Sequence, residues 1–188
     1  MPDESHDFLH ALRIAEALVF ASDKPIPLAR IQLALPAGVE APAVMTALAA
    51  RTAGAAVELV EVAGGFAFRT ALDLAPAITR VVEVPRRLPR AAMEALAIIA
   101  YHQPVTRAEI EEIRGAALSQ ATMDSLLEAG LVGPRGRKET PGRPTLWGTT
   151  PRFLDQFGLK SMAELPRKED LVSQDLAVLE LVPPPEAP

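Results

Sequence analysis

The 188-residue sequence contains no cysteine. This absence excludes a disulfide framework and any zinc site built on thiolates, and it suits a reducing compartment. No uncharged apolar run approaches the roughly 18 residues that a membrane-spanning helix requires. The first five residues are acidic and lack the basic head and apolar stretch of a secretory signal peptide. We therefore expect a soluble, cytoplasmic protein.

Recognisable catalytic motifs are also missing. The sequence has no G-x-S-x-G and no H-E-x-x-H, and its glycine-rich run at 133–138 lacks the G-K-[ST] ending of a phosphate-binding loop. His6 and His10 are spaced to share one helix face, but no third metal ligand is evident. His102 follows a helical stretch, where histidine more often caps carbonyls than catalyses. We expect no enzymatic activity, no cofactor and no bound metal.

Positive charge is scarce as well. The formal net charge is −5, and only residues 85–143 are mildly basic, with nine basic and seven acidic side chains. Because affinity for duplex DNA comes mostly from Lys and Arg on phosphates, this balance argues against general DNA binding.

The most informative segment that is present spans residues 89–131, which predicts three short helices joined by tight turns. Thr106 and Glu109 form a capping box at the start of the second helix. Gly115 ends that helix, and Ser119 can cap the third. Three short helices in this order make a helix-turn-helix core, which binds macromolecules more often than it performs catalysis.

The first half of the chain has the same plan. Three helices are predicted at 8–21, 28–35 and 43–52. An alternating strand at 57–62 then meets Gly64-Gly65 and an apolar return at 66–70, which indicates a β-hairpin. Three helices followed by a hairpin make a winged helix.

The second set of helices is also followed by a predicted hairpin. A strand starts at 131–133, a wing tip covers 134–142, and a return strand covers 143–149, before a last short helix at 151–157. We predict a mainly α fold with small β-hairpins, arranged as two tandem winged-helix domains and a disordered C-terminal tail. The predicted boundaries are 1–84, 85–166 and 167–188.

The third helix of a winged helix normally reads DNA bases in the major groove. The two candidates here, 43–51 and 119–128, carry one cation at the far end and none, respectively. The basic wing could still contact phosphate without sequence specificity through Arg135, Arg137 and Lys138, although a solvated hairpin tip explains the same charges. A winged-helix transcription regulator that uses this wing is the alternative function.

The first helix of each half is apolar nearly all round, whereas a surface helix normally has one apolar stripe. One face can pack on its own domain, and the other must meet something else. For the helix at 91–101 we infer a partner chain or the neighbouring domain, unless its alanines simply tolerate exposure. For the first helix we infer a second copy of the chain, through Phe8, Leu9, Leu12, Val19 and Phe20.

Several ordered motifs resemble one family, segregation and condensation protein B. They are Leu96–Gly115, Gly136–Lys138, Pro141–Pro144 and Thr149–Leu159, together with Ile14–Phe20 and the hairpin at Glu61–Phe66. The resemblance covers about residues 8 to 166. Pro89 departs from it, because the family more usually has a Ser cap there, and so does the apolar turn at 116–118.

The resemblance implies a non-enzymatic, nucleoid-associated subunit of a bacterial condensin-like complex. Members dimerise through the N-terminal domain and bind the central part of the kleisin, segregation and condensation protein A, which connects them to the SMC ATPase. The predicted partner site contains Ile98, Ile99, Tyr101, Arg114, Arg143 and Trp147. For the two arginines a turn-bracing salt bridge is an alternative, and for Trp147 it is core packing.

Overall fold

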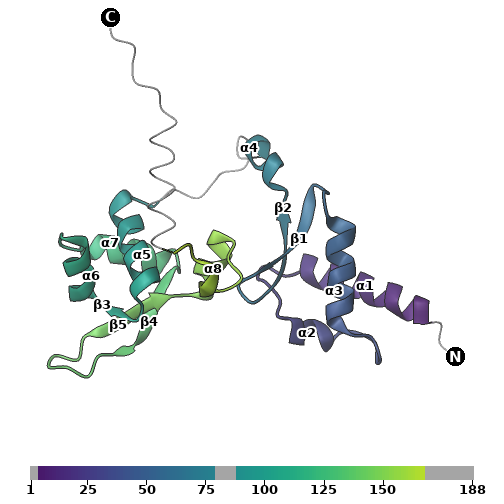
Figure 1. The fold of residues 1–188 in the computed structure, drawn as a ribbon, viewed down its shortest axis with the longest axis horizontal. Helices are drawn as coiled ribbons and strands as arrows, with labels where there is room; N and C mark the ends of the chain where they lie inside the picture. Colours follow the sequence, from purple (N-terminus) through teal and green to yellow (C-terminus); the bar gives the residue numbers. More distant parts are fainter. Residues whose placement is uncertain (1–3, 79–87, 168–188) are drawn as a thin grey trace, which may run out of the picture.

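The computed structural model describes residues 4–78 and 88–167. In the first half, residues 4–78, three helices precede a two-stranded antiparallel hairpin (Figure 1). The elements are α1 (Glu4–Phe20), α2 (Leu28–Gln32), α3 (Ala41–Thr52), β1 (Val57–Val62), β2 (Gly65–Thr70), η1 (Leu72–Leu74) and α4 (Ala75–Ile78). This order confirms the helices and the hairpin expected through residue 70, whereas η1 and α4 have no counterpart in the sequence prediction.

The hairpin turn is built for the right-handed twist of its strands. Ala63 and Gly64 both have positive φ, at 51° and 72°, as hairpin turns of the primed types require. Gly65 is needed for a different reason, because a Cβ there would lie 2.7 Å from the backbone of Ile26. Ile26 and Phe66 exchange two backbone hydrogen bonds of 2.9 Å, so the segment before α2 runs beside β2. This long-range pairing is absent from the sequence prediction.

The second half, residues 88–167, again places helices before a hairpin. The elements are α5 (Arg90–His102), β3 (Val105–Thr106), α6 (Arg107–Arg114), α7 (Gln120–Glu128), β4 (Val132–Arg137), β5 (Thr145–Thr149), α8 (Pro151–Phe157) and η2 (Met162–Glu164). The strands form an antiparallel sheet in the order β3-β5-β4. The first strand of this hairpin was predicted too short and its wing tip too long, since β4 continues to Arg137. Pro134 lies within β4, which is an edge strand, the kind of strand that tolerates proline.

Side chains cap the N-termini of α6, α7 and α8 in the second half. The Thr106 hydroxyl accepts from the Glu109 amide and the Glu109 carboxylate accepts from the Thr106 amide, which confirms the capping box. The Ser119 and Thr150 hydroxyls cap α7 and α8 by accepting from the Thr122 and Phe153 amides, without the reciprocal carboxylate. Helix α5, by contrast, starts at Pro89 without a side-chain cap, as the departure from the family pattern predicts.

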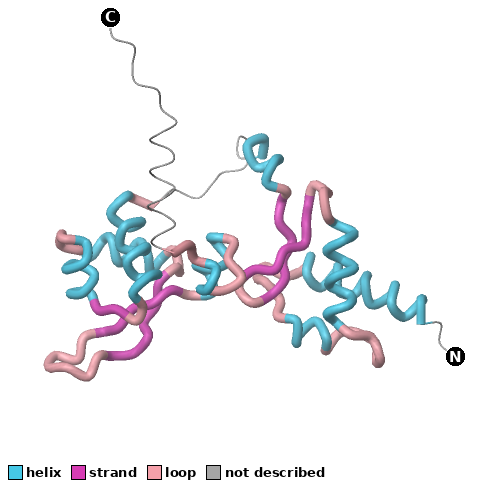
Figure 2. Tube along the Cα trace, in the orientation of Figure 1, coloured by secondary structure: helices cyan, strands magenta, loops and turns pink. Residues whose placement is uncertain are grey.

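The buried apolar residues form two separate clusters, one in each half. Figure 2 shows the helices, strands and loops of both halves along the backbone. The largest fully buried side chains are Ile31, Val44, Met45, Leu48 and Val62 in the first half and Leu96, Ile99, Ile110, Leu118 and Leu126 in the second. The fold is thus mixed α/β, with helices and small antiparallel sheets. The predicted boundary at 84/85 and all but the first residue of the predicted tail lie outside the described residues. In the part that is described, no helix has the length and apolarity to span a bilayer.

Candidate protein-binding surfaces

Helix α1 divides the five predicted dimer residues between two faces. Leu12 and Val19 are only 7% and 3% exposed and belong to the core of the first half. They lie on the helical stripe that also carries Ala15, so α1 uses them against its own domain. Leu9 and Phe20, by contrast, are 60% and 82% exposed. Phe8 is half-buried against the core.

The exposed face of α1 borders a hollow of about 720 Å³. Its walls come from α1, the end of α3 and the hairpin, and the apolar side chains that line it are Ile14, Ala17, Phe20, Val57 and Phe68. Val57 is 50% exposed as well. Exposed aromatic and branched side chains beside a hollow are typical of a surface that another protein covers.

The predicted partner site on α5 is only partly at the surface. Ile99 is fully buried in the second core, whereas Ile98 is partly buried against it. The Tyr101 hydroxyl donates to the Pro166 carbonyl at 2.7 Å, which places the end of the described chain beside α5. Trp147 packs against the core and pairs with Val105 across the sheet, so the core-packing alternative accounts for its position. Because Ile99 is buried, it belongs to the core beneath this surface and not to the surface itself.

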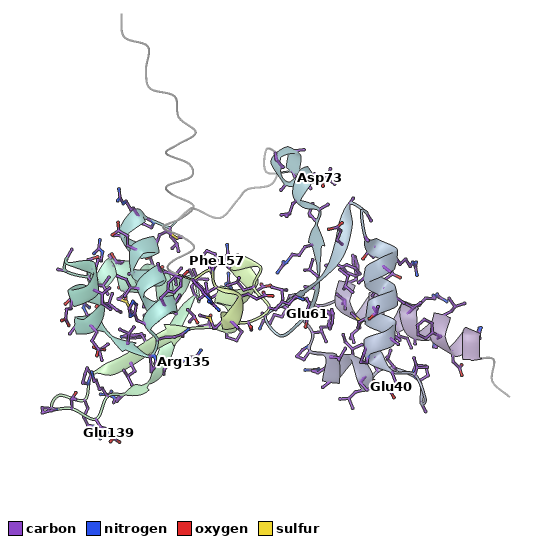
Figure 3. The ribbon with its side chains drawn as sticks, viewed as in Figure 1. Glu40, Glu61, Asp73, Arg135, Glu139 and Phe157 are labelled. Carbon is purple, nitrogen blue, oxygen red and sulfur yellow. The ribbon has the colours of Figure 1, made fainter. Side chains whose placement is uncertain are left out.

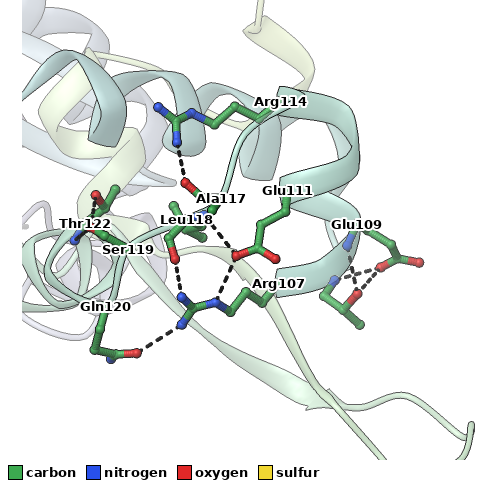
Figure 4. A network of polar contacts seen from close by, with 10 residues as sticks. Arg107, Glu109, Glu111, Arg114, Ala117, Leu118, Ser119, Gln120 and Thr122 are labelled. Atoms are coloured by element: carbon green, nitrogen blue, oxygen red, sulfur yellow. Dashed lines mark hydrogen bonds and ion pairs between the residues drawn. The ribbon is translucent and has the colours of Figure 1, made fainter.

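The two predicted rim arginines lie on different elements. Arg114, at the end of α6, donates to Glu94 of α5 at 3.1 Å and to the Ala117 carbonyl at 3.0 Å. The second of these bonds is visible in Figure 4. The arrangement matches the bracing alternative for Arg114, and the hydrogen bond from Arg114 is the first cause that lowers the pKa of Glu94. Arg143 is exposed in the turn between β4 and β5, where its φ is 39°.

A polar network connects α6 to the turn before α7 (Figure 4). Arg107 donates to Glu111 at 3.3 Å, to Gln120 at 3.0 Å and to the Leu118 carbonyl. Glu111 in turn accepts the Leu118 amide at 2.9 Å, which is the main reason that its pKa is lowered. Although the side chains at 116–118 are apolar, the turn still makes polar contacts with α6, because its backbone amide and carbonyl groups form the hydrogen bonds.

The cations of the β4–β5 hairpin, the predicted basic wing, are largely engaged with the second half itself. Lys138 donates to Glu109 at 2.6 Å, and this bond is the first cause that lowers the pKa of Glu109 to about 2. Arg135, labelled in Figure 3, donates to the Thr149 carbonyl. Its side chain crosses over Gly148, where a Cβ would lie 2.7 Å away. Arg137 donates to the Arg143 carbonyl at 3.4 Å. These three cations remain exposed, yet each has a partner within the wing or α6.

The third helices present little positive charge to solvent. On α7 the exposed charged side chains are Asp124 and Glu128. On α3 the exposed cation is Arg51, which pairs with Glu16 at 3.6 Å. Neither helix therefore has the Arg, Lys, Asn or Gln row that reads base edges.

Some exposed apolar residues were not singled out from the sequence. They are Leu33, Val57, Leu72, Ile78, Met93, Ile113, Leu127 and Phe157. Met93 and Ile113, at 42% and 47% exposed, extend the apolar surface of α5 and α6. Helix α5 is apolar nearly all round, so its pattern separates the inner face poorly from the outer one, and Met93 was not singled out.

Comparison with known proteins gives one consistent family. The family model for the segregation and condensation complex subunit ScpB matches residues 13–168. Segregation and condensation protein B of Geobacillus kaustophilus is 46% identical over 162 residues, which are 83% of this chain and 74% of that protein. The protein of the same description from Bacillus subtilis is 39% identical over 90% of this chain and 88% of its own length. The crystal structure of ScpB from Mycobacterium tuberculosis is 29% identical over 81% of this chain and 97% of that chain, with a TM-score of 0.38.

Proposed function

We propose a specific architectural role for this chain, which belongs to the ScpB family and is a subunit of the segregation and condensation complex. Two such chains form a homodimer through their first halves. Each second half binds the central region of the kleisin subunit, and through it the SMC ATPase. The two halves act as winged-helix domains without a DNA-reading role, and the complex works on the chromosome in the cytoplasm.

The observation that carries the homodimer is the exposed face of α1. Leu9 and Phe20 lie on the side of α1 that the core leaves uncovered, and Phe20 borders the hollow formed with Val57 and Phe68. A twofold interface requires a surface that is complementary to itself. A protruding aromatic ring beside an apolar hollow on the same face meets this requirement, since each copy can insert its ring into the other.

The kleisin site is supported by the surface around α5. Ile98, Tyr101 and Trp147 are partly exposed above the second core, and Met93 extends their apolar surface. Arg143 supplies an exposed positive charge in the turn between β4 and β5. An apolar helical surface with a charged rim is suited to capturing a helical or extended segment of a partner.

Binding of the purified chain to a central kleisin fragment tests this function. We expect a complex whose mass, measured by light scattering, corresponds to a chain dimer with bound fragment. Arg143→Glu reverses an exposed rim charge and should weaken fragment binding about tenfold, or about 1.4 kcal/mol. Lys24→Glu makes the same reversal on the exposed surface of the first half and should leave fragment binding unchanged.

If the purified chain does not bind the kleisin fragment, the proposal is contradicted. Gel-shift assays at physiological salt address the alternative of a transcription regulator. Saturable, sequence-dependent binding to duplex DNA would favour that alternative, since it requires the base-edge contacts that α3 and α7 lack.

A further inference from the structure

The two halves meet at a small polar contact that we call the joint. The residues that form it lie far apart in the sequence. It contains Glu61, Ala63, Gly64 and Arg69 of the hairpin and Asp155, Leu159 and Lys160 from the end of α8 and the residues after it. The Ala63 amide donates to the Leu159 carbonyl at 2.8 Å, and the Gly64 amide donates to the Lys160 carbonyl at 3.1 Å. These two bonds take up the outward-facing N–H groups of the hairpin turn, which would otherwise bond to water.

Ion pairs flank the two backbone bonds. Lys160 contacts Glu61 at 3.1 Å, and Arg69 pairs with Asp155. In both pairs one partner is on the hairpin and the other follows or belongs to α8, but the charge order is reversed between them. The joint therefore has a defined orientation, because sliding one half along the other would bring like charges together. Figure 3 shows Glu61 where the hairpin approaches α8.

The acceptor side of the joint is held rigidly by the second half. Gly158 has a φ of 68° and ends α8 in a left-handed turn, and the Leu159 amide then donates to the Leu154 carbonyl at 2.9 Å. The Leu159 side chain packs against the second core, and the Lys160 amide donates to Glu164 at 2.6 Å. Contacts within the second half therefore fix the direction of the Leu159 and Lys160 carbonyls, which accept the amides of the hairpin turn.

We propose that the joint holds the two halves in one mutual orientation in the absence of any partner. The halves belong to one chain, so their high effective concentration lets two backbone bonds and two ion pairs hold them together. The joint thereby sets the direction of the α1 face relative to the α5 surface. The inference goes beyond the proposed function and stands or falls independently of kleisin binding.

A distance measurement between the halves tests this proposal. The chain has no cysteine, so Ala50→Cys on α3 and Ala121→Cys on α7, both exposed, give two unique sites for spin labels. Labelled chain diluted into an excess of unlabelled chain reports only the distance within one molecule. We expect a single narrow distance distribution for the otherwise unaltered chain.

Charge variants identify the joint as the cause. Lys160→Glu opposes Glu61 with a second carboxylate and should replace the narrow distribution by a broad one. The combination of Glu61→Lys with Lys160→Glu restores opposite charges and should restore the narrow distribution. Arg51→Glu is the matched control, because it breaks an ion pair within the first half whose side chains are about as exposed (58% and 39%, against 54% and 47% for Lys160 and Glu61).

Two results would overturn the proposal. One is a broad or multiple distribution in the unaltered chain. The other is a narrow distribution that survives both Lys160→Glu and Asp155→Asn, the second of which removes the ion pair between Asp155 and Arg69. Circular dichroism of each variant shows that its helices remain folded, so that a broad distribution reports the loss of the joint.

Discussion

The two halves of the molecule share an order of elements but are stabilised in different ways. In the second half, side chains cap α6, α7 and α8, and arginines join α5, α6 and the turn before α7. In the first half, α2 and α3 start at Pro27 and Glu40 without a side-chain cap. The ion pair that the structure shows within residues 4–78 is Arg51 with Glu16, at 3.6 Å.

This difference extends to the surface. The first half leaves Leu9, Leu33 and Phe20 at 60%, 86% and 82% exposed, whereas the most exposed large apolar residue in the described second half is Ile113, at 47%. A half that depends on apolar packing and retains apolar surface is suited to self-association. A half with polar bracing presents a more sharply defined surface, which suits recognition of one partner segment.

The largest expected effect tests whether the two cores are independent. Leu48→Ala and Leu126→Ala each remove a fully buried leucine, one from each core. Each should lower the free energy of unfolding of its own half by about 2–5 kcal/mol. Native-state hydrogen exchange should show lost protection only in the half that carries the substitution. Equal loss in both halves would contradict the separation of the cores.

A second prediction concerns the close packing of the first hairpin. Gly65→Ala places a Cβ within 2.9 Å of three backbone atoms of Pro25 and Ile26, so it should destabilise the first half by about 1–3 kcal/mol. Gly133→Ala in β4 is the matched control, since its Cβ would meet Thr150 at an ordinary 3.5 Å. Urea denaturation measures both variants. If Gly65→Ala is as stable as Gly133→Ala, the pairing of Ile26 with Phe66 is not as close as the structure shows.

The capping comparison predicts a smaller effect. Thr106→Ala removes the hydroxyl of the capping box and should cost about 0.5–2 kcal/mol. Glu40→Ala removes an N-cap side chain that makes no cap bond, so the cost should stay within about 0.5 kcal/mol. Thermal unfolding of the two variants compares them directly. Equal losses would show that polar capping does not distinguish the halves.

The pH dependence of the second half follows from Glu109. Lys138, and then the amide and hydroxyl of Thr106, lower the pKa of this carboxyl from 4.5 to about 2. Because the folded-state pKa is the lower one, the stabilisation is complete above pH 4.5 and is lost as the pH falls towards 2. Glu109→Gln should therefore be less stable than the unaltered chain at pH 7, and the difference should shrink below pH 4.5.

Denaturant unfolding at pH 7, 5 and 3 measures this difference. Glu112→Gln removes the same charge from an exposed position of α6, and its stability at pH 7 should stay near that of the unaltered chain. A Glu109→Gln difference that is constant from pH 7 to pH 3 would contradict the assignment.

Local rules account for most of what the sequence predicts correctly. The capping box at Thr106, the helix end at Gly115 and the first hairpin all depend on residues within a few positions of one another. The turn of that hairpin lies at Ala63-Gly64, one residue before the predicted Gly64-Gly65. The bridge between Ile26 and Phe66 joins distant segments, and no nearby residue signals it. The ion pair between Glu61 and Lys160 in the joint also connects distant segments, so no nearby residue signals it either.

The surface residues of α1 show a different limit. A helix that is apolar nearly all round gives no direction for its inner face, because every side could pack. The sequence therefore predicts that α1 has spare apolar surface without separating Leu12 and Val19, which are buried, from Leu9 and Phe20, which are exposed. Only the position of α3 and the hairpin decides between them.

The mass of the purified chain in solution, with and without Phe20→Glu, tests the central claim most directly. Light scattering should give the mass of two chains for the unaltered protein and of one chain for Phe20→Glu. Leu72→Glu, which charges a residue that is 90% exposed outside α1, should remain dimeric. A monomer for the unaltered chain, or a dimer that tolerates Phe20→Glu, would contradict the assignment of the α1 face to self-association.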